Sequence, residues 1–289
     1  MQKIKLISDS TGDISSTNII EREDVEIMPI KIRIDEKEYR DWMDYDMKAF
    51  FEMMRTAENI PTTALPAPES FKESYIRAWR QGYTHVVTVT INAKASGTYQ
   101  SSTIGKSLFF EENPDAAIEI YNIDSTTYSV LMGMPIRNAL QKVPGISFEE
   151  LCREIERESI RMEAVIVCDT LSYFQRTGRV SKISGTVGEM LGIKPVLQVG
   201  HGDVAFYGTV RGKKNVNKSI IDYVKKNIDE NEKELYVVGG DCEEEICGLE
   251  EQIKEAFPEY SVTRETLGSA IIINTGPRVT GVAFRRKME

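Results

Sequence analysis

Apolar positions in the first half of the chain follow two alternating spacings. Short runs rich in β-branched residues predict strands at Lys3–Ser8, Glu26–Ile34, His85–Ile91, Ala117–Ile123 and Ala164–Cys168. Between these runs, apolar residues three and four positions apart predict helices at Met47–Thr56, Glu69–Arg80 and Ser125–Gln141. Pro135 is expected to kink or divide the last of these helices. Such alternation is typical of a mostly parallel sheet covered by helices on both faces.

The second half has shorter intervals between its apolar runs. Strands are predicted at Lys194–Val199, Asp203–Val210, Leu235–Val238, Ser261–Glu265, Ala270–Asn274 and, at the chain end, Gly281–Arg286. Helices are predicted at Val216–Lys226 and Glu244–Phe257. This half therefore resembles a mixed sheet with helices packed on one side.

The length of 289 residues favours two α/β domains, each with its own core. The pattern changes near Arg161, after an amphipathic helix at Phe148–Glu158, so the domains are expected to span residues 1–161 and 162–289. The chain has no internal repeat and no long linker. We therefore expect the larger N-terminal and smaller C-terminal domains to pack closely, with a ligand in the cleft between them.

Composition and charge narrow the class of protein. Apolar residues make up 41% of the chain and charged residues 28%, which is the balance of a soluble globular protein. The formal net charge of -9 argues against nucleic-acid binding, which needs a basic face. No run approaches the roughly 20 apolar residues of a membrane span. Because the chain start reads directly into a strand, we expect a cytoplasmic protein without stable membrane insertion.

The usual sequence signs of catalysis are missing. His85 and His201 are the only histidines, and neither lies in a nucleophile motif. The P-loop, the dinucleotide-binding glycine motif and the H-E-x-x-H zinc motif are all absent. The four cysteines lack zinc spacing and are expected to be free thiols. These absences argue against a Ser-His-Asp or Cys-His hydrolase and remove the commonest sequence grounds for nucleotide binding, and we expect no cofactor and no metal.

Hydroxyl-rich turns follow several predicted strands, and they begin near Ser8, Pro61 and Ala95. Ligands of open α/β sheets bind beyond the carboxyl ends of strands, where helix N-termini point N–H groups at an anion. The hydroxyls of Ser96 and Thr98 can donate to a carboxylate without adding charge, and Gly97 allows close backbone approach. Ser96 as a simple helix cap is the alternative, and the two roles are compatible.

Charged side chains offer two further candidates. Asp9 and Asp13 have a spacing compatible with metal ligation, but two carboxylates in a turn favour turn and cap roles over a metal site. Arg176, Arg179 and Lys182 form a basic cluster on an acidic chain, which is typical of a phosphate site, of a surface for an acidic partner, or of a solvated helix end.

Taken in order, several motifs resemble those of the DegV family. They are Ile7-Ser8-Asp9-Ser10-Thr11, Ser96-Gly97-Thr98-Tyr99-Gln100-Ser101-Ser102, Asp169-Thr170-Leu171 with Arg176-Thr177-Gly178-Arg179-Val180-Ser181-Lys182, and Gly192-Ile193-Lys194-Pro195-Val196-Leu197. Proteins of this family are bacterial fatty-acid-binding proteins that carry the lipid for a separate ATP-dependent fatty acid kinase. The resemblance implies two α/β domains with one long-chain fatty acid between them.

The resemblance also implies site residues. Thr63 and Ser96 would bind the lipid carboxylate, which the kinase would convert to an acyl phosphate for phospholipid synthesis. Two stretches depart from the family pattern: Ala64 and Leu65 stand where polar residues are common, and Asn274 stands where a histidine is common. Asn274 carries no charge, so Arg278 becomes a candidate to assist the carboxylate. Gly97 and Thr98 complete the expected ligand contacts, and Arg176, Arg179 and Lys182 are expected to face the kinase.

Two other functions remain open at this stage. One is a lipid carrier without a kinase partner. The other is an enzyme that converts a small carboxylate or phosphate. The enzyme would use Asp9, Ser10 and the cluster at Arg176 and Arg179.

Overall fold

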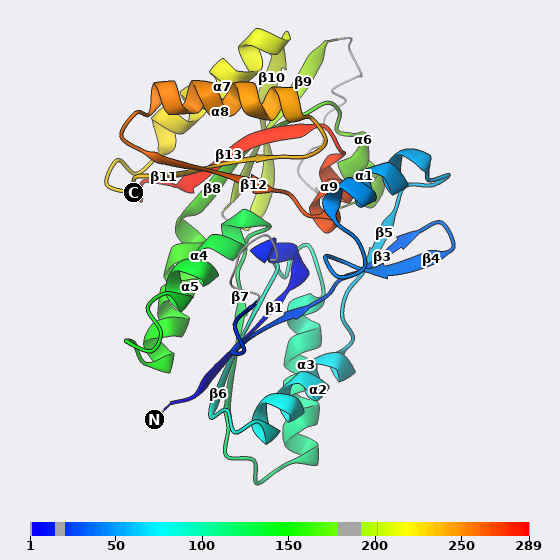
Figure 1. The fold of residues 1–289 in the computed structure, drawn as a ribbon, viewed down its shortest axis with the longest axis vertical. Helices are drawn as coiled ribbons and strands as arrows, with labels where there is room; N and C mark the ends of the chain where they lie inside the picture. Colours follow the sequence, from blue (N-terminus) through cyan, green and yellow to red (C-terminus); the bar gives the residue numbers. More distant parts are fainter. Residues whose placement is uncertain (1, 15–20, 179–191, 201, 289) are drawn as a thin grey trace. The chain divides into compact units, whose positions relative to one another are not determined.

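The computed structural model describes residues 2–14, 21–178, 192–200 and 202–288. The chain folds into two compact units, Met1–Ile160 and Arg161–Glu289. Each unit has its own sheet and apolar core, and the predicted α/β class is confirmed, with a parallel sheet in the first unit and a mixed sheet in the second (Figure 1). Within the described residues, no helix combines the length and apolar character needed to cross a membrane.

The first unit is built on a four-stranded parallel sheet with the order β2-β1-β6-β7. Its strands are β1 (Ile4–Asp9), β2 (Val25–Met28), β6 (His85–Thr90) and β7 (Glu119–Asp124). A small antiparallel sheet, β4-β3-β5, contains β3 (Lys31–Ile34), β4 (Lys37–Arg40) and β5 (Thr62–Ala64). The single strand expected at Glu26–Ile34 is thus two strands in two sheets. Pro29 lies between them, and its lack of an N–H suits the break.

Helices cover both faces of the parallel sheet. They are α2 (Pro68–Arg80), α3 (Thr98–Glu112), α4 (Val130–Leu140) and α5 (Phe148–Arg161). Helix α1 (Met47–Thr56) follows β4, and a short 3-10 helix, η1, lies at Ser10–Gly12. Alternate strand residues point to opposite faces, so Ile7 and Val86 pack with α2 and α3, whereas Leu6 and Val87 pack with α4 and α5.

The helix predicted from Ser125 begins later, at Val130. Thr126 and Ser129 have φ values of 56° and 53°, and this left-handed backbone is incompatible with the first turn of a right-handed helix. Pro135 lies inside α4, which continues through it.

Helices α2 and α3 pack closely at Gly105. A Cβ atom built there would lie 2.6 Å from the Pro68 carbonyl oxygen and 2.7 Å from the Phe71 Cβ. Only a residue without a side chain therefore allows α3 its present position against α2. This contact also fixes where the N-terminus of α3 lies in the first unit.

The second unit is built on a six-stranded sheet with the order β10-β9-β8-β13-β11-β12. Its strands are β8 (Met162–Cys168), β9 (Ile193–Gly200), β10 (Asp203–Arg211), β11 (Glu234–Gly239), β12 (Ser261–Thr266) and β13 (Val279–Arg285). Among the described residues of this sheet, only the β11–β12 pair is parallel. The helices are α6 (Ser172–Thr177), α7 (Lys213–Asn227), α8 (Glu243–Ala256) and α9 (Ser269–Thr275). Helices α7 and α8 share one core with the sheet, which fits the prediction of helices on one side.

The strand predicted at Ala270–Asn274 is wrong, because this segment forms α9. An apolar run this short has no periodicity that separates a buried strand from a buried helix. Extended Gly268 precedes the helix, and Gly276 ends it with a φ of 83°. Packing against α6, including the close approach of Gly276 to the Tyr173 ring, decides the outcome.

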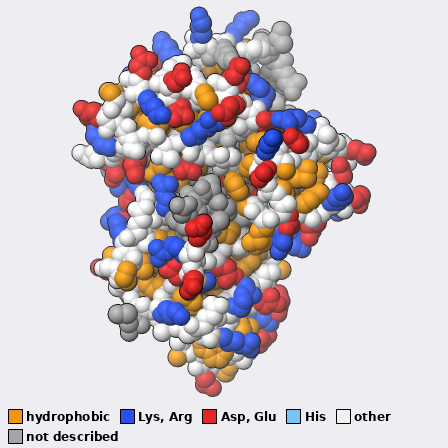
Figure 2. Space-filling view, in the orientation of Figure 1, with side chains coloured by type: hydrophobic (Ala, Val, Ile, Leu, Met, Phe, Trp, Pro, Cys, Tyr) orange, Lys and Arg blue, Asp and Glu red, His pale blue; other side chains and the backbone are white. Residues whose placement is uncertain are grey.

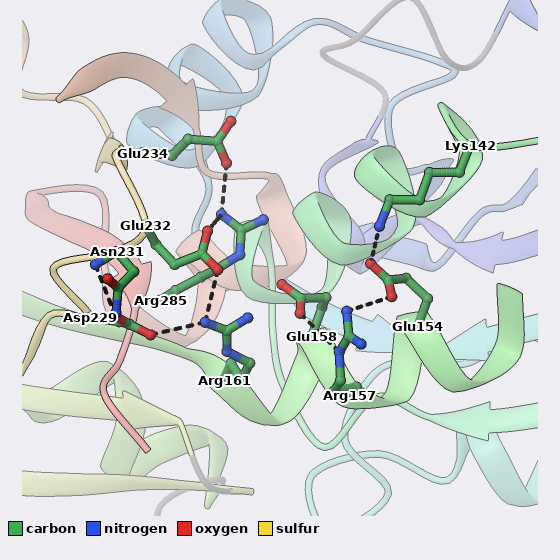
Figure 3. A network of polar contacts seen from close by, with 10 residues as sticks. All are labelled: Lys142, Glu154, Arg157, Glu158, Arg161, Asp229, Asn231, Glu232, Glu234 and Arg285. Atoms are coloured by element: carbon green, nitrogen blue, oxygen red, sulfur yellow. Dashed lines mark hydrogen bonds and ion pairs between the residues drawn. The ribbon is translucent and has the colours of Figure 1, made fainter. Parts of the chain in front are cut away.

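Ion pairs stabilise the end of the chain within the second unit (Figure 3). The Arg285 guanidinium, 5% exposed, lies 2.7 Å from a Glu234 carboxylate oxygen. Arg161 donates to Asp229 at 3.1 Å and to Glu232 at 2.8 Å. A buried guanidinium needs such partners, since an unpaired buried charge is costly. These contacts join the end of α5, through Arg161, and the end of β13, through Arg285, to the segment that leads into β11.

Replacement of Gly105 by alanine is expected to lower the free energy of unfolding by about 1–3 kcal/mol, because the methyl group must displace the neighbouring helix. Gly248 in α8 is the matched control, since nothing lies within 4 Å of the position of its Cβ. Gly248→Ala should instead add up to about 1 kcal/mol through helix propensity. Urea unfolding followed by circular dichroism measures both. Equal shifts of the two unfolding midpoints would contradict the prediction.

Candidate functional site

The candidate site begins where β1 and β6 end. These strands are neighbours, but the chain leaves β1 toward β2 on one side and leaves β6 through α3 toward β7 on the other. Open α/β sheets bind ligands outside the carboxyl ends of strands at such a reversal. The hydroxyl-rich turns after both strands therefore meet at one edge of this sheet.

The Asp9 side chain joins the two strand ends. One carboxylate oxygen accepts from the Thr11 N–H at 3.0 Å, and the other accepts from the Ile91 N–H at 2.8 Å. Asp9 is 1% exposed, and burial raises the pKa of its carboxyl group, whereas hydrogen bonds from Thr11 and Ile91 lower it. Asp9 therefore has its acceptors engaged in holding the fold.

Ser10 is also engaged within the fold. Its hydroxyl donates to Asp41 at 2.7 Å and accepts from the Ile30 N–H at 3.0 Å. The Ser129 hydroxyl donates to Asp13. In the described part of the chain, no group of three or more His, Cys, Asp or Glu side chains has a geometry suited to a metal ion. The side chains of Asp9, Ser10 and Asp13 therefore all make hydrogen bonds within the fold.

Ser96 and Thr98 form a hydroxyl pair at the start of α3. Their side-chain oxygens lie 2.8 Å apart, and the Thr98 N–H donates to the Ser96 hydroxyl at 3.4 Å. Thr98 is buried, Ser96 is half-buried and Gly97 is exposed. The hydroxyl pair thus stands at the positive end of a 15-residue helix dipole. Gly97 is the N-cap of α3, so Ser96 precedes the cap and meets the first turn only through the Thr98 N–H, and its role as a donor to an anion stays a prediction.

Asn92 positions the loop that carries Ser96, and this residue was not predicted from the sequence. Its side chain accepts from the Lys94 N–H at 2.9 Å and donates to the Tyr128 hydroxyl at 2.7 Å. Its carbonyl oxygen accepts from the N–H of Ser96 at 3.1 Å. An asparagine directly after a strand is the signal for such a turn, because its side chain bonds to the backbone two residues on.

Thr63 lies on β5, opposite Ile32 of β3, and is half-buried. The segment that follows it contacts the start of α3. A Cβ atom built on Gly97 would lie 3.2 Å from the Leu65 side chain, and the Ser101 hydroxyl donates to the Pro66 carbonyl at 2.5 Å. Two segments more than thirty positions apart, those of Thr63 and Ser96, are thereby brought together in the first unit.

The predicted contacts from the second unit have partners of their own. The Asn274 amide donates to the Ala270 carbonyl at 2.7 Å within α9. Arg278 donates to Asp169 at 3.0 Å and also pairs with Glu245. The roles of Asn274 and Arg278 as ligand contacts therefore stay predictions. Two carboxylates compensate the charge of Arg278.

Of the basic cluster, Arg176 lies at the end of α6 and is exposed. The helix ends at Gly178, whose φ of 67° suits a glycine C-cap. Arg179 and Lys182 lie outside the described residues. The kinase-facing role of these three side chains stays a prediction.

Comparisons with known proteins cover nearly the whole chain. The model of the DegV family, described as "Uncharacterised protein, DegV family", matches residues 3–287. A DegV domain-containing protein of Caldanaerobacter subterraneus subsp. tengcongensis is 30% identical over 289 residues, which cover 99% of this chain and 100% of the relative.

Two solved structures are similar in fold and sequence. A stearic acid-binding protein from Eubacterium ventriosum is 28% identical with a TM-score of 0.87, and the match covers 99% of each chain. A DegV family protein from Thermus thermophilus, described for its fatty acid binding, is 27% identical with a TM-score of 0.84, over 98% of this chain and 100% of that one. With the sheet order and the hydroxyl-rich turns, these matches show that the chain belongs to the DegV family.

Proposed function

We propose that this protein binds a long-chain fatty acid and presents its carboxylate to a separate ATP-dependent fatty acid kinase. The observation that carries the proposal is the Ser96–Thr98 hydroxyl pair at the N-terminus of α3, with the segment after Thr63 packed beside it. Membership of a family with stearic acid-binding and fatty acid-binding proteins supports a lipid as the ligand. The protein itself would be the non-catalytic lipid-carrying subunit.

The carboxylate would be held by neutral donors. If the Thr98 hydroxyl donates to Ser96, the Ser96 O–H is left to donate to a lipid oxygen, and the Thr63 hydroxyl supplies a second donor. The dipole of α3 favours an anion at this end. Exposed Gly97 lets the carboxylate approach the backbone. These hydroxyl donors orient the head group without adding a charge of their own.

Apolar side chains around Thr63 suit a lipid. Leu65 is 42% exposed, and hydrophobic side chains gather over the surface of α1 and the β3–β5 sheet (Figure 2). Each buried methylene contributes about 0.8 kcal/mol, so a long chain offers roughly ten kcal/mol before the cost of ordering it. The tail would therefore supply most of the affinity. That the lipid lies between the two domains stays a prediction.

Asn274 and Arg278 would make secondary contacts with the carboxylate. Arg278 would have to exchange bonds with Asp169 or Glu245 to do so. The hydroxyls of the first unit therefore carry most of the proposed recognition.

The kinase would supply the nucleotide and transfer a phosphoryl group to the lipid carboxylate. Exposed Arg176, together with Arg179 and Lys182, would face this partner. Basic side chains on a chain of net charge -9 favour an acidic surface as their counterpart.

Two alternatives differ in how well the geometry supports them. An enzyme that uses Asp9 and Ser10 would have to release both from hydrogen bonds of the fold, so this alternative has less support. A carrier of fatty acid without a kinase shares the lipid site and differs only in its partner.

Bound lipid is expected to accompany the purified protein. Denaturing extraction followed by mass spectrometry should detect about one fatty acid of roughly 16–18 carbons per chain, because burial of such a tail makes dissociation slow. Chains without lipid should take up labelled fatty acid. Failure of both measurements would reject the lipid site.

Removal of either proposed carboxylate donor is expected to weaken fatty acid binding. Ser96→Ala and Thr63→Val should each cost about 1 kcal/mol, which is roughly a fivefold rise in Kd. Ser107→Ala is the matched control, because among the described residues this exposed hydroxyl of α3 bonds only to the Thr103 carbonyl, at 3.3 Å. Fluorescent fatty acid titration measures all three. Unchanged affinity of Ser96→Ala and Thr63→Val would reject these donors.

Charge reversal at Arg176 is expected to impair coupling to the kinase without impairing lipid binding. Arg176→Glu should lower the rate of acyl phosphate formation by about tenfold, since a rim charge mainly changes association with the partner. Arg80→Glu, which alters an exposed arginine of α2, is the control and should retain the rate. Acyl phosphate is trapped with hydroxylamine for the assay. Equal rates for wild type and Arg176→Glu would refute the proposed kinase-facing surface.

A further inference from the structure

The second unit contains a cavity of about 260 Å³, and among its described lining residues only Arg278 is also a proposed contact of the fatty acid. It lies at the edge of the six-stranded sheet where β8 and β11 end and where β9 and β13 begin. Helices α7 and α8 both begin at this edge, and residues of their first turns line the cavity. All of its lining residues belong to the second unit.

A carboxylate holds two cations at the wall of the cavity. The Lys194 ammonium lies 2.5 Å from one oxygen of Asp169, and the Arg278 guanidinium lies 3.0 Å from the other. Each cation retains further N–H donors, because an ammonium has three and a guanidinium has five. Asp169 therefore fixes two cationic donors in place without using all their hydrogen-bonding capacity.

Lys214 adds a third cation from the first turn of α7. Its ammonium makes no ion pair with any side chain in the part of the chain that the structure describes. The helix has Gly212 as its N-cap, which provides no side-chain hydrogen bond to the first turn. An unpaired ammonium beside the positive end of a 15-residue helix favours an anion.

Thr280 provides an independent sign of a ligand. Its side chain lines the cavity and is 6% exposed. Within residues 2–14, 21–178, 192–200 and 202–288, its hydroxyl has no hydrogen-bond partner. A hydroxyl that lines a cavity and makes no hydrogen bond within the fold can both donate to a ligand and accept from one.

The neighbouring thiol offers no alternative chemistry. Cys242 lines the same cavity, and its thiol donates to the Val279 carbonyl at 3.3 Å. Burial raises the pKa of Cys242 to about 11, so the thiol stays protonated and is a poor nucleophile near neutral pH. Recognition by hydrogen bonds and charge is the chemistry that the remaining side chains support.

We propose that this cavity binds the phosphate group of a small phosphomonoester or inorganic phosphate. Phosphate oxygens accept several hydrogen bonds, and they match the convergent donors of Lys194, Lys214 and Thr280. Among the described lining residues, the cations Lys194, Lys214 and Arg278 are balanced by Asp169, Glu244 and Glu245, which disfavours a polyphosphate. The volume also lies below the roughly 300–1,000 Å³ of typical pockets for larger ligands.

Recognition would be local to the cavity. Acidic and basic side chains are interspersed over the surface of α7 and α8 in the view of Figure 2. Mixed charges produce little long-range attraction, so specificity would come from the donors at the cavity wall, of which Asp169 holds those of Lys194 and Arg278 in place. The hydroxyl donors of the proposed fatty acid site belong to the first unit, whereas Arg278 is shared by the two proposals.

Isothermal titration of the full-length protein with inorganic phosphate and with glycerol 3-phosphate tests the proposal. Saturable binding of one ligand per chain is expected, and Lys214→Gln should weaken it by about tenfold or more, as expected for loss of a charge-assisted hydrogen bond. Thr280→Val should weaken it several-fold. Lys218→Gln, an equal charge change at an exposed position of α7 outside the lining, should leave the affinity unchanged.

Circular dichroism establishes that each variant is folded. Absence of saturable binding with both phosphate probes would overturn the proposal. An equal loss of affinity in Lys214→Gln and Lys218→Gln would also overturn it, because that result indicates only a general field effect. Acetate binding as tight as phosphate binding would exclude phosphate as the recognised group.

Discussion

The buried carboxylate of Asp9 is the interaction on which the first unit's ligand edge depends. It accepts from the backbone after β1 through Thr11 and from the backbone after β6 through Ile91. Without it, two buried N–H groups at the switch point of the sheet would lose their acceptor, which is unfavourable in an apolar interior. The loop that follows Ile91 carries Asn92 and then Ser96, so the placement of the proposed carboxylate donor derives from this link.

The first unit combines neutral donors with apolar surroundings. A hydroxyl pair at a helix N-terminus attracts an anion more weakly than an arginine does, but it adds no charge that must be desolvated when an acyl chain packs nearby. Leu65 beside Gly97 makes this edge less polar than the family pattern implied by the resemblance. Orientation by hydroxyl groups and affinity from methylene burial are consistent with each other in such a setting.

The second unit differs from the first, because its candidate ligand contacts include charged side chains. Arg278, which the sequence singles out as a possible ligand contact, lies between Asp169 and Glu245, and Lys194 shares Asp169 with it. Arg161 and Arg285 are likewise satisfied by acidic side chains near the chain end (Figure 3). Lys214 differs from these cations, because no described side chain pairs with it. The wall of the cavity therefore has a cation that a ligand would pair, whereas the ion pairs of Arg161 and Arg285 form without a ligand.

The sequence by itself determined the α/β class, the order of most strands and helices, and the family. These features rest on local periodicity and on motifs of consecutive residues, both of which are present in the linear chain. It also selected Thr63 and Ser96 as candidates, although only the fold brings their two segments together through Leu65 and Pro66.

Only the tertiary structure decided features whose energy comes from distant partners. The run Ala270–Asn274 becomes a helix because α6 packs against it, and Glu26–Ile34 becomes two strands because two different sheets offer partners. The engagement of Asp9 with Ile91 and of Arg278 with Asp169 joins residues about eighty or more positions apart. Such contacts leave no local pattern, since the free energy that selects them appears only when the distant groups are buried together.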